Sequence, residues 1–254
     1  MNVLIVGGHG FIGSHFSKEF IKQYPKAEVT IYDTDKPNGK PSQDIKNARK
    51  TGLPERKMPS STILYDYIFH FGALASLRSK TTLEQYMINN VYNLQVLLRS
   101  VRYRKIIYIS SSSVITDNYN YYKMSKQMAE LIIPEGNLII RPCTVFGLNG
   151  RPDMLVTRVK NKEKITVNGD PETIFRYYTY VGDLVKCIMQ SFPNETGTIN
   201  AIGNKLYSIK EVLELGKVEY EVGEADTRDF GKYTLFNNDK YWFCNTSLEE
   251  YLKE

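Results

Sequence analysis

The sequence is poor in the residues that build disulfide frameworks and metal sites. It has three cysteines and three histidines among 254 residues, and no Cys-x-x-Cys pair. An odd number of cysteines without paired spacing is typical of a reducing compartment, so we expect a cytoplasmic protein without disulfides. The histidines His9, His15 and His70 lack metal-ligand spacing to any cysteine or aspartate cluster, so no metal site is predicted.

Long apolar runs and dense charge runs are also missing. No stretch of 18 apolar residues occurs, which argues against a membrane span, and the opening Met-Asn-Val-Leu-Ile-Val-Gly-Gly predicts a strand instead of a signal peptide. The most basic run, residues 102–105, is interpreted as a solvated turn before a strand. We therefore expect no nucleic-acid partner, and the net charge of +5 suits a small anionic substrate.

Strand and helix patterns alternate through the first two thirds of the chain. Continuous apolar runs predict buried strands at 3–6, 29–32, 67–71, 106–109 and 138–140, and helices are predicted near 12–20, 83–100 and 122–131. Such alternation requires crossover connections between parallel strands. The predicted fold class is therefore α/β, with a doubly wound parallel sheet.

Three glycines follow the first predicted strand, where the chain turns into a helix. At Gly7, Gly10 and Gly13 a side chain would block a pyrophosphate resting on the helix N-terminus. Asp33 ends the second predicted strand, 20 residues after Gly13. An acid there accepts hydrogen bonds from the adenosine ribose and repels a 2′-phosphate, which favours NAD over NADP.

A tyrosine and a lysine lie four positions apart on the helix predicted over 122–131. Tyr122 and Lys126 therefore face the same side of that helix. An adjacent ammonium favours the phenolate of a tyrosine and turns it into an effective acid–base group. Serines at 110–113, at the end of a predicted strand, supply candidates for a hydroxyl that shares the substrate's oxygen.

In this order, the motifs resemble the NAD-dependent epimerase/dehydratase family of extended short-chain dehydrogenases/reductases, whose members act on nucleotide-diphosphate sugars. The resemblance covers nearly the whole chain. Beyond the glycine turn, Asp33 and the Tyr122/Lys126 pair, the matching segments are Asp44-Ile45, Phe69-His70-Phe71-Gly72-Ala73, Asn90-Val91, residues 141–147, residues 176–183 and residues 198–203. It implies a Rossmann fold, NAD as cofactor and a homodimer built on the helices near 83–100 and 122–131.

The resemblance implies a role for each matching residue. Ser111, Tyr122 and Lys126 are the expected catalytic residues, with Ser112 as the fallback for Ser111. The expected cofactor-binding residues are Gly7, Gly10, Phe11, Ile12, Gly13, Asp33, Asp44, Ile45, Phe71, Gly72, Ala73, Asn90, Ser110, Tyr122 and Lys126. The expected substrate-binding residues are Ser112, Thr144, Arg176 and Arg228, with the arginines placed for a diphosphate.

The regular alternation of strand and helix patterns ends at about residue 147, and we place the predicted domain boundary there. We predict an NAD-binding Rossmann domain over residues 1–147 and a mainly substrate-binding, small mixed lobe over 148–254. Whether later segments near 176–202 return to the first domain stays open. Ser208 with Glu211, and Ser247 with Glu250, form capping boxes that predict helix starts in the lobe.

The chain departs from the family at positions that narrow the reaction. Family 4,6-dehydratases carry an Asp-Glu pair after the catalytic hydroxyl, whereas Ser112 and Ser113 stand here. Thr144 replaces a common asparagine near the diphosphate, and only 11 positions separate Ser111 from Tyr122, which shortens a loop around the sugar.

The first hypothesis is an NAD-dependent nucleotide-diphosphate-sugar epimerase, most simply a 4-epimerase that passes through a 4-keto sugar. A net oxidoreductase, reductase or decarboxylase on a related sugar would use the same three residues and stays an alternative. A non-catalytic dinucleotide-binding or RNA-binding relative is the alternative from a different class.

Overall fold

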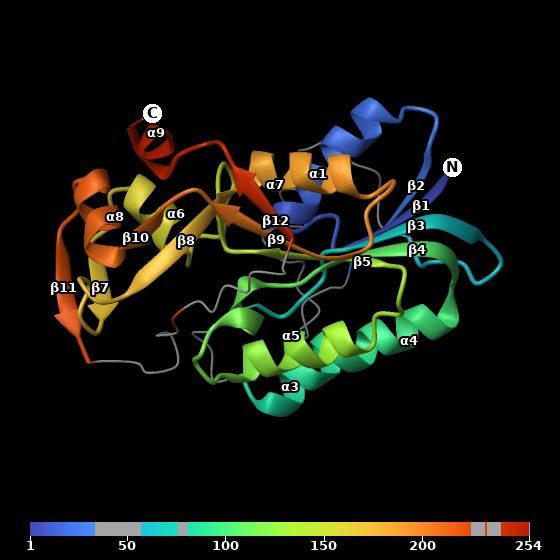
Figure 1. The fold of residues 1–254 in the computed structure, drawn as a ribbon, viewed down its shortest axis with the longest axis horizontal. Helices are drawn as coiled ribbons and strands as arrows, with labels where there is room; N and C mark the ends of the chain where they lie inside the picture. The colour runs from blue at the N-terminus through green and yellow to red at the C-terminus, as the bar shows by residue number, and fades with distance from the viewer. Residues whose placement is uncertain (34–56, 76–80, 225–231, 233–239, 254) are drawn as a thin grey trace. The chain divides into compact units, whose positions relative to one another are not determined.

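A parallel sheet organises most of the molecule. The computed structural model describes residues 1–33, 57–75, 81–224, 232 and 240–253 (Figure 1). Seven parallel strands lie in the order β12-β9-β5-β4-β3-β1-β2. They are β1 (Asn2–Val6), β2 (Glu28–Tyr32), β3 (Leu64–His70), β4 (Arg102–Ile109), β5 (Leu138–Pro142), β9 (Gly197–Gly203) and β12 (Lys240–Cys244). The predicted doubly wound α/β class is confirmed.

The first strand is the point at which the order of the sheet reverses. Ile5 of β1 pairs with Ile31 of β2 on one side and with Phe69 of β3 on the other. Val3, Leu4 and Ile5 are completely buried, as expected for a strand covered on both faces. Ligands of such sheets bind beyond the carboxyl ends of the strands at this reversal, which is where the glycine turn begins.

Helices cover both faces of strands β1 to β4. Figure 1 shows α1 (Phe11–Gln23) on one face, and α4 (Asn93–Ser100) beside α5 (Tyr121–Leu131) on the other. The α1 helix buries Phe16 and Phe20, whose rings lie 4.4 and 5.4 Å from that of Phe69. Burying three aromatic rings anchors the helix that follows the glycine turn.

The helix predicted over 83–100 is continuous, but its middle turn is wider than expected. It consists of α3 (Leu83–Met87), a π-helical segment η1 (Ile88–Tyr92) and α4. Thr82 caps its start in a capping box with Gln85. The buried positions Tyr86, Asn90, Leu94 and Leu97 follow one another at spacings of three and four residues, as in an α-helix, so the sequence pattern does not reveal the π turn.

The prediction of a solvated turn at residues 102–105 is wrong. These residues form the first half of β4, so the strand is twice as long as the apolar run at 106–109 indicated. Arg102 and Arg104 point to the exposed side, and Arg104 pairs with Asp66 of β3 at 3.3 Å. Exposed and half-buried residues alternate over this first half of the strand, so its sequence is as polar as that of a turn.

The chain divides into two compact units, each described here by itself. One comprises residues 1–110, 121–140 and 188–198, and the other comprises 111–120, 141–187 and 199–254. The predicted boundary at residue 147 stays a prediction. Among the described helices, none combines the length and the apolar character needed to cross a membrane. Within the same described residues, no three His, Cys, Asp or Glu side chains are grouped to hold a metal ion.

The second unit holds two small sheets and a core of its own. The sheets have the strand orders β10-β8-β6 and β11-β7, and the first mixes parallel with antiparallel pairing. Besides strands of the large sheet, its elements are η2 (Ser112–Ile115), β6 (Thr144–Phe146), α6 (Leu155–Lys160), β7 (Ile165–Asn168), β8 (Phe175–Tyr180), β10 (Leu206–Ser208), α8 (Ile209–Gly216), β11 (Tyr220–Gly223) and α9 (Leu248–Lys253). The helix α7 (Val181–Ser191) begins in this unit, and its residues 188–191 belong to the first. Phe146, Val159, Val212 and Leu213 lie in its buried core.

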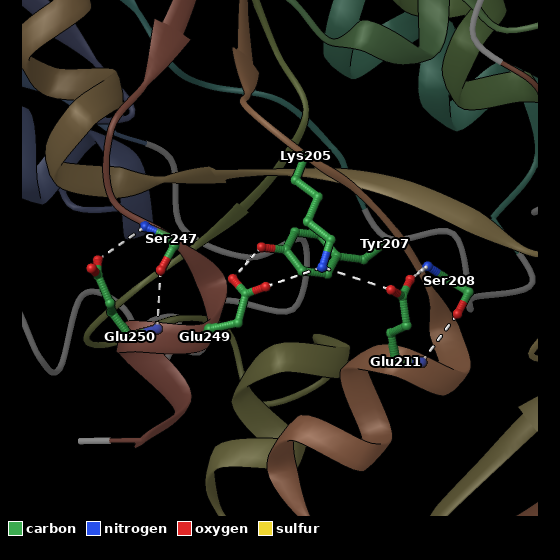
Figure 2. Close-up of polar contacts among 7 residues, drawn as sticks. All are labelled: Lys205, Tyr207, Ser208, Glu211, Ser247, Glu249 and Glu250. Atoms are coloured by element: carbon green, nitrogen blue, oxygen red, sulfur yellow. Dashed lines mark hydrogen bonds and ion pairs between the residues drawn. The ribbon is translucent and has the colours of Figure 1, made fainter.

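Both predicted capping boxes are present and start two helices of this unit, α8 and α9 (Figure 2). The Ser208 hydroxyl accepts from Glu211 N–H at 3.1 Å, and the Glu211 carboxylate accepts from Ser208 N–H at 2.7 Å. The same reciprocal pair joins Ser247 and Glu250, at 3.1 and 3.3 Å. Each box supplies acceptors for two N–H groups that a helix start leaves without partners.

A lysine ties the two helix starts together. Figure 2 shows Lys205 between two carboxylates, and its Nζ lies 3.2 Å from Glu249 and 3.7 Å from Glu211. The ammonium also lies 4.4 Å from the centroid of the Tyr207 ring, and the Tyr207 hydroxyl donates a hydrogen bond to Glu249. Burial, and next the Glu249 carboxylate, raise the pKa of Tyr207, so the phenol stays protonated and donates this hydrogen bond.

Candidate cofactor and active site

The glycine turn after β1 is too tight for side chains at two of its positions. Gly7 has φ of 74° and donates its N–H to Tyr32 O at 2.8 Å, which joins the turn to the end of β2. A Cβ on Gly13 would lie 2.1 Å from Gly7 O, closer than two atoms can approach. The turn therefore brings backbone against backbone and leaves a cradle that only glycine keeps open.

The start of α1 is not capped by any side chain. Gly10 occupies the N-cap position without a side-chain hydrogen bond, and the first turn carries no acidic residue. Phe11, Ile12 and Gly13 form that first turn, so their N–H groups and the positive end of the helix dipole face the turn. A helix start of this kind suits an anion such as a pyrophosphate. The predicted binding of the cofactor at these residues stays a prediction.

Asp33 stands directly after β2 and contacts the glycine turn. Its Oδ2 accepts a hydrogen bond from His9 N–H at 3.0 Å. The carboxylate is thereby oriented at the carboxyl end of the sheet, beside the same turn. This placement suits an acid that binds ribose hydroxyls.

The loop after β3 is held on a buried amide. Asn90, in the π-helical segment, accepts from Leu74 N–H at 2.7 Å and donates to Leu74 O at 3.1 Å. It also donates to the Ser125 hydroxyl at 2.8 Å, and this hydroxyl donates to Tyr122 O at 2.7 Å. Asn90 therefore connects the loop carrying Phe71, Gly72 and Ala73 to the helix of Tyr122; its predicted contact with the cofactor stays a prediction.

Lys126 is an almost completely buried lysine, with 1% of its surface exposed. Its Nζ donates to the Tyr108 hydroxyl at 2.7 Å and to Ile109 O at 2.8 Å, both at the end of β4. Burial lowers the pKa of Lys126 from 10.5 to about 7, although the Glu130 carboxylate acts in the opposite direction. Tyr122 lies one turn earlier on α5 and is half-buried, with its ring 6.2 Å from that of Tyr86.

Tyr108 and His70 complete the surroundings of Lys126, and the sequence had not singled out either for this role. Burial and the nearby Lys126 lower the pKa of His70 to about 3, so this imidazole is neutral at physiological pH. Its Nδ1 is buried without a hydrogen-bond partner among the described residues. Their positions in the sequence could have indicated this role, because both residues lie at the carboxyl ends of strands. In the structure they pair with each other across β3 and β4.

The serine run divides between the two units. Ser110 belongs to the first, where its N–H donates to Ile140 O at 2.8 Å, and its buried Oγ has no partner among the described residues. Ser111, in the second, accepts from Ser113 N–H at 3.2 Å as the cap of η2. Ser112 is buried and hydrogen-bonds the thiol of Cys143, whose pKa burial raises to about 12. Ser111 is thus the more exposed of the two catalytic candidates.

Besides Ser112, the expected substrate residues Thr144 and Arg176 lie in the second unit. Thr144 starts β6 and pairs with Tyr178 of β8. Arg176, also on β8, is half-buried and donates to Phe175 O at 2.9 Å. Asp44, Ile45 and Arg228 lie outside the described residues, so their expected contacts stay predictions.

Residues 3–203 match the NAD dependent epimerase/dehydratase family, which is more than half of the chain. The chain belongs to this family. An uncharacterized UDP-glucose epimerase of Bacillus subtilis is 28% identical over 260 residues, which cover 85% of this family member and 81% of that protein. A trifunctional UDP-glucose 4,6-dehydratase/UDP-4-keto-6-deoxy-D-glucose 3,5-epimerase/UDP-4-keto-L-rhamnose-reductase of Arabidopsis thaliana is 23% identical, and the match covers 100% of this chain but 46% of that one.

Solved structures of the family share the fold. UDP-glucuronic acid 4-epimerase from Bacillus cereus, in complex with UDP-glucuronic acid and NAD, superposes with a TM-score of 0.75 at 22% identity, covering 100% of this chain and 97% of that one. UDP-glucose 4-epimerase from Thermotoga maritima, with UDP-glucose, has a TM-score of 0.76 at 20% identity and covers 100% and 96%. At these identities the likeness establishes the epimerase/dehydratase fold of this family member.

Proposed function

We propose that this family member is an NAD-dependent nucleotide-diphosphate-sugar epimerase, most simply a 4-epimerase. The observation that carries the proposal is the buried Lys126, one helical turn from Tyr122, in the same unit as the glycine turn and Asp33. Burying an ammonium costs folding free energy, and buried ionisable groups with shifted pKa values are concentrated at functional sites. The names of the relatives, which are epimerases of UDP-sugars, favour the same reaction.

The first unit supplies the groups that would hold the cofactor. The first turn of α1 would bind the pyrophosphate, with Gly7 and Gly13 allowing its approach, and Asp33 would bind the adenosine ribose. When bound, NAD supplies the chemistry of taking up and returning a hydride. Lys126 would bind the nicotinamide ribose with the face of its ammonium that is turned away from Tyr108.

Tyr122 is the proposed acid–base group. A tyrosine has an ordinary pKa of about 10, and an ammonium one turn away favours the phenolate that takes the proton of the sugar's 4-hydroxyl. Ser111 would share a hydrogen bond with the same oxygen. After the 4-keto sugar has turned in its pocket, Tyr122 returns the proton and the opposite configuration results. Thr144 and Arg176 would bind the diphosphate.

The residues after Ser111 favour epimerisation over dehydration. An elimination needs an acid and a base beside the sugar, and the corresponding positions hold Ser112 and Ser113. The Ser112 hydroxyl is in any case hydrogen-bonded to Cys143. A net oxidoreductase or a decarboxylase would use the same three residues, and so remains the alternative that the assay must separate.

The test is to incubate the purified protein and NAD with UDP-, dTDP-, GDP- and CDP-sugars and to analyse the products by NMR. We expect a sugar inverted at C4 without net change of NAD. Stoichiometric accumulation of NADH would replace the proposal by an oxidoreductase. NAD binding without turnover of any sugar would instead favour a non-catalytic dinucleotide-binding relative.

We also propose a cytoplasmic homodimer with an NAD-binding domain at 1–147 and a substrate lobe at 148–254. Large apolar side chains are exposed on η1, α4 and α5, which suits a helix-to-helix interface between subunits; they are Ile88, Tyr92, Val96, Met128 and Leu131. The three cysteines are buried and none of them forms a disulfide, which suits a reducing compartment. Sedimentation would test the dimer, since a monomer at all concentrations contradicts it, and cell fractionation would test the compartment.

A further inference from the structure

The ammonium of Lys126 is held from inside the protein by neutral acceptors. An ammonium has three N–H donors, and two of them are used by the Tyr108 hydroxyl and Ile109 O, at 2.7 and 2.8 Å. Both acceptors lie at the carboxyl end of β4, beneath the α5 helix that carries the lysine. This leaves one N–H for the site side, so two bonds to the strand determine where the third points.

Tyr108 is built to be such an acceptor. Its side chain is fully buried in the core between β4 and α5, beside Leu4, Ile106 and Ala129. Burial, and next the charges of Tyr122 and Glu130, raise the pKa of Tyr108 well above its usual value. The hydroxyl is therefore a neutral phenol at neutral pH, and its oxygen accepts the hydrogen bond from the lysine.

The other ionisable groups near Lys126 do not replace this contact. Burial, and next the charge of Lys126, lower the pKa of His70 on β3, so this imidazole is neutral. Glu130, one turn further along α5, favours the ammonium electrostatically but is not one of its hydrogen-bond partners. Tyr122 lies on the preceding turn of the same helix. Of the groups on β3, β4 and α5 that act on Lys126, Tyr108 is thus the side chain that hydrogen-bonds it.

We propose that Tyr108 is a positioning residue for the reaction, whose hydroxyl holds the Lys126 ammonium in place beside Tyr122. The inference rests on the proposed function, because it assigns Tyr108 a role only through Lys126. The hydroxyl contributes in two ways. It fixes the direction of the remaining N–H, and it stabilises the charged form of the lysine, which in turn favours the Tyr122 phenolate.

Tyr108→Phe removes this oxygen while keeping the ring in the core. One N–H of the buried ammonium then loses its acceptor, so the lysine both moves and holds its proton less tightly. We expect kcat to fall roughly 10-fold, as for a misplaced catalytic group, with KM for the sugar nearly unchanged. Weaker support for the phenolate raises the pKa of Tyr122, so the acidic limb of the kcat profile moves to higher pH.

Tyr65→Phe is the matched control. Tyr65 is equally buried in the same core, on β3, and its hydroxyl likewise accepts a hydrogen bond, from Ser60 N–H at 3.1 Å. Both variants lose one buried tyrosine hydroxyl and its hydrogen bond. If Tyr108 were merely structural, the two would lower the melting temperature alike and leave kcat and its pH profile at wild-type values; that result would overturn the proposal.

A second measurement separates this inference from the proposed function. The ¹³C signal of the Lys126 Cε can be titrated in protein with labelled lysine, without any sugar. We expect its pKa to lie lower in Tyr108→Phe than in wild type and to be unchanged in Tyr65→Phe. A lowered pKa in a protein that converts no sugar would sink the epimerase proposal alone. Equal pKa values, in a protein that epimerises sugars normally, would sink the role of Tyr108 alone.

Discussion

Two lysines, one in each unit, show opposite ways of placing a positive charge. Lys126 has 1% of its surface exposed and is hydrogen-bonded to two neutral oxygens, whereas half of the Lys205 side chain is exposed and two carboxylates lie within 4 Å. The first arrangement lowers the pKa of the lysine to about 7. In the second arrangement, two carboxylates compensate the charge of Lys205, and its side chain stays in contact with water.

This difference distinguishes a lysine of a candidate functional site, Lys126, from a lysine that only supports the fold, Lys205. A buried ammonium without a carboxylate partner destabilises the folded chain, and a protein retains such a group where its charge is needed. An exposed ion pair contributes little and can be lost at little cost. Substitutions around Lys126 should therefore change chemistry, and substitutions around Lys205 should change only stability.

The largest effect is expected from Tyr122→Phe. Removal of the acid–base hydroxyl should lower kcat by about 10³-fold, within the range for general acid–base groups. NAD affinity, measured by fluorescence titration, should remain nearly at the wild-type value. Tyr121→Phe, on the exposed neighbouring residue, is the control and should be fully active. Persistent activity of Tyr122→Phe would remove Tyr122 from the catalytic site.

The next effect concerns the cofactor and is expected from Gly13→Ala. Its methyl group would lie 2.1 Å from Gly7 O, so the turn must open and the helix start must move. NAD affinity should fall by about 100-fold, roughly the energy of two hydrogen bonds to an anion. Gly10→Ala places its methyl at 3.3 Å from the same oxygen and should lose less. Equal affinities in calorimetry for wild type and Gly13→Ala would contradict a pyrophosphate site at this turn.

Lys126→Met should lower the activity and yet stabilise the cofactor-free protein. The folded-state pKa of this lysine is lowered, so the unfolded chain binds more protons between about pH 7 and 10.5. The burial penalty is therefore complete below pH 7 and is relieved as the pH rises through this window. We expect a gain of about 1 to 2 kcal/mol in the free energy of unfolding at pH 6, shrinking toward pH 10.

Urea unfolding of both proteins at pH 6 and pH 9 measures this gain. Lys18→Met, on the exposed face of α1, is the control and should leave the free energy of unfolding nearly unchanged at both pH values. A Lys126→Met protein that is less stable than wild type at pH 6 would show that the hydrogen bonds to Tyr108 and Ile109 outweigh the burial penalty.

The smallest effect is expected from Lys205→Met, with the opposite sign. Loss of the contacts to Glu211 and Glu249 should destabilise the protein by less than about 1 kcal/mol, and salt should reduce the difference. Sugar turnover should stay at the wild-type rate. A change in kcat would show that this cluster belongs to the active site and would break the contrast between the two lysines.

Local chemistry made much of the fold predictable. The apolar runs at 3–6 and 138–140 are buried strands, and the capping boxes at Ser208 and Ser247 start helices, because these signals act within a few residues. Two features were not predicted correctly, because they do not depend on nearby residues alone. The basic start of β4 and the π turn around Asn90 depend on neighbouring strands and helices, which a local pattern does not contain.

Some properties of the candidate site could likewise be predicted from the sequence, and others could not. Sequence alone determined the residue types and their spacing: a glycine turn before a helix, an acid after the second strand, and a tyrosine and a lysine on one helical face. Tertiary structure alone decided that Lys126 is buried and that Tyr108 and Ile109, 18 and 17 positions earlier, are its partners. The reason is physical, because burial and desolvation depend on what packs around a side chain, and parallel strands bring together residues that are distant along the chain.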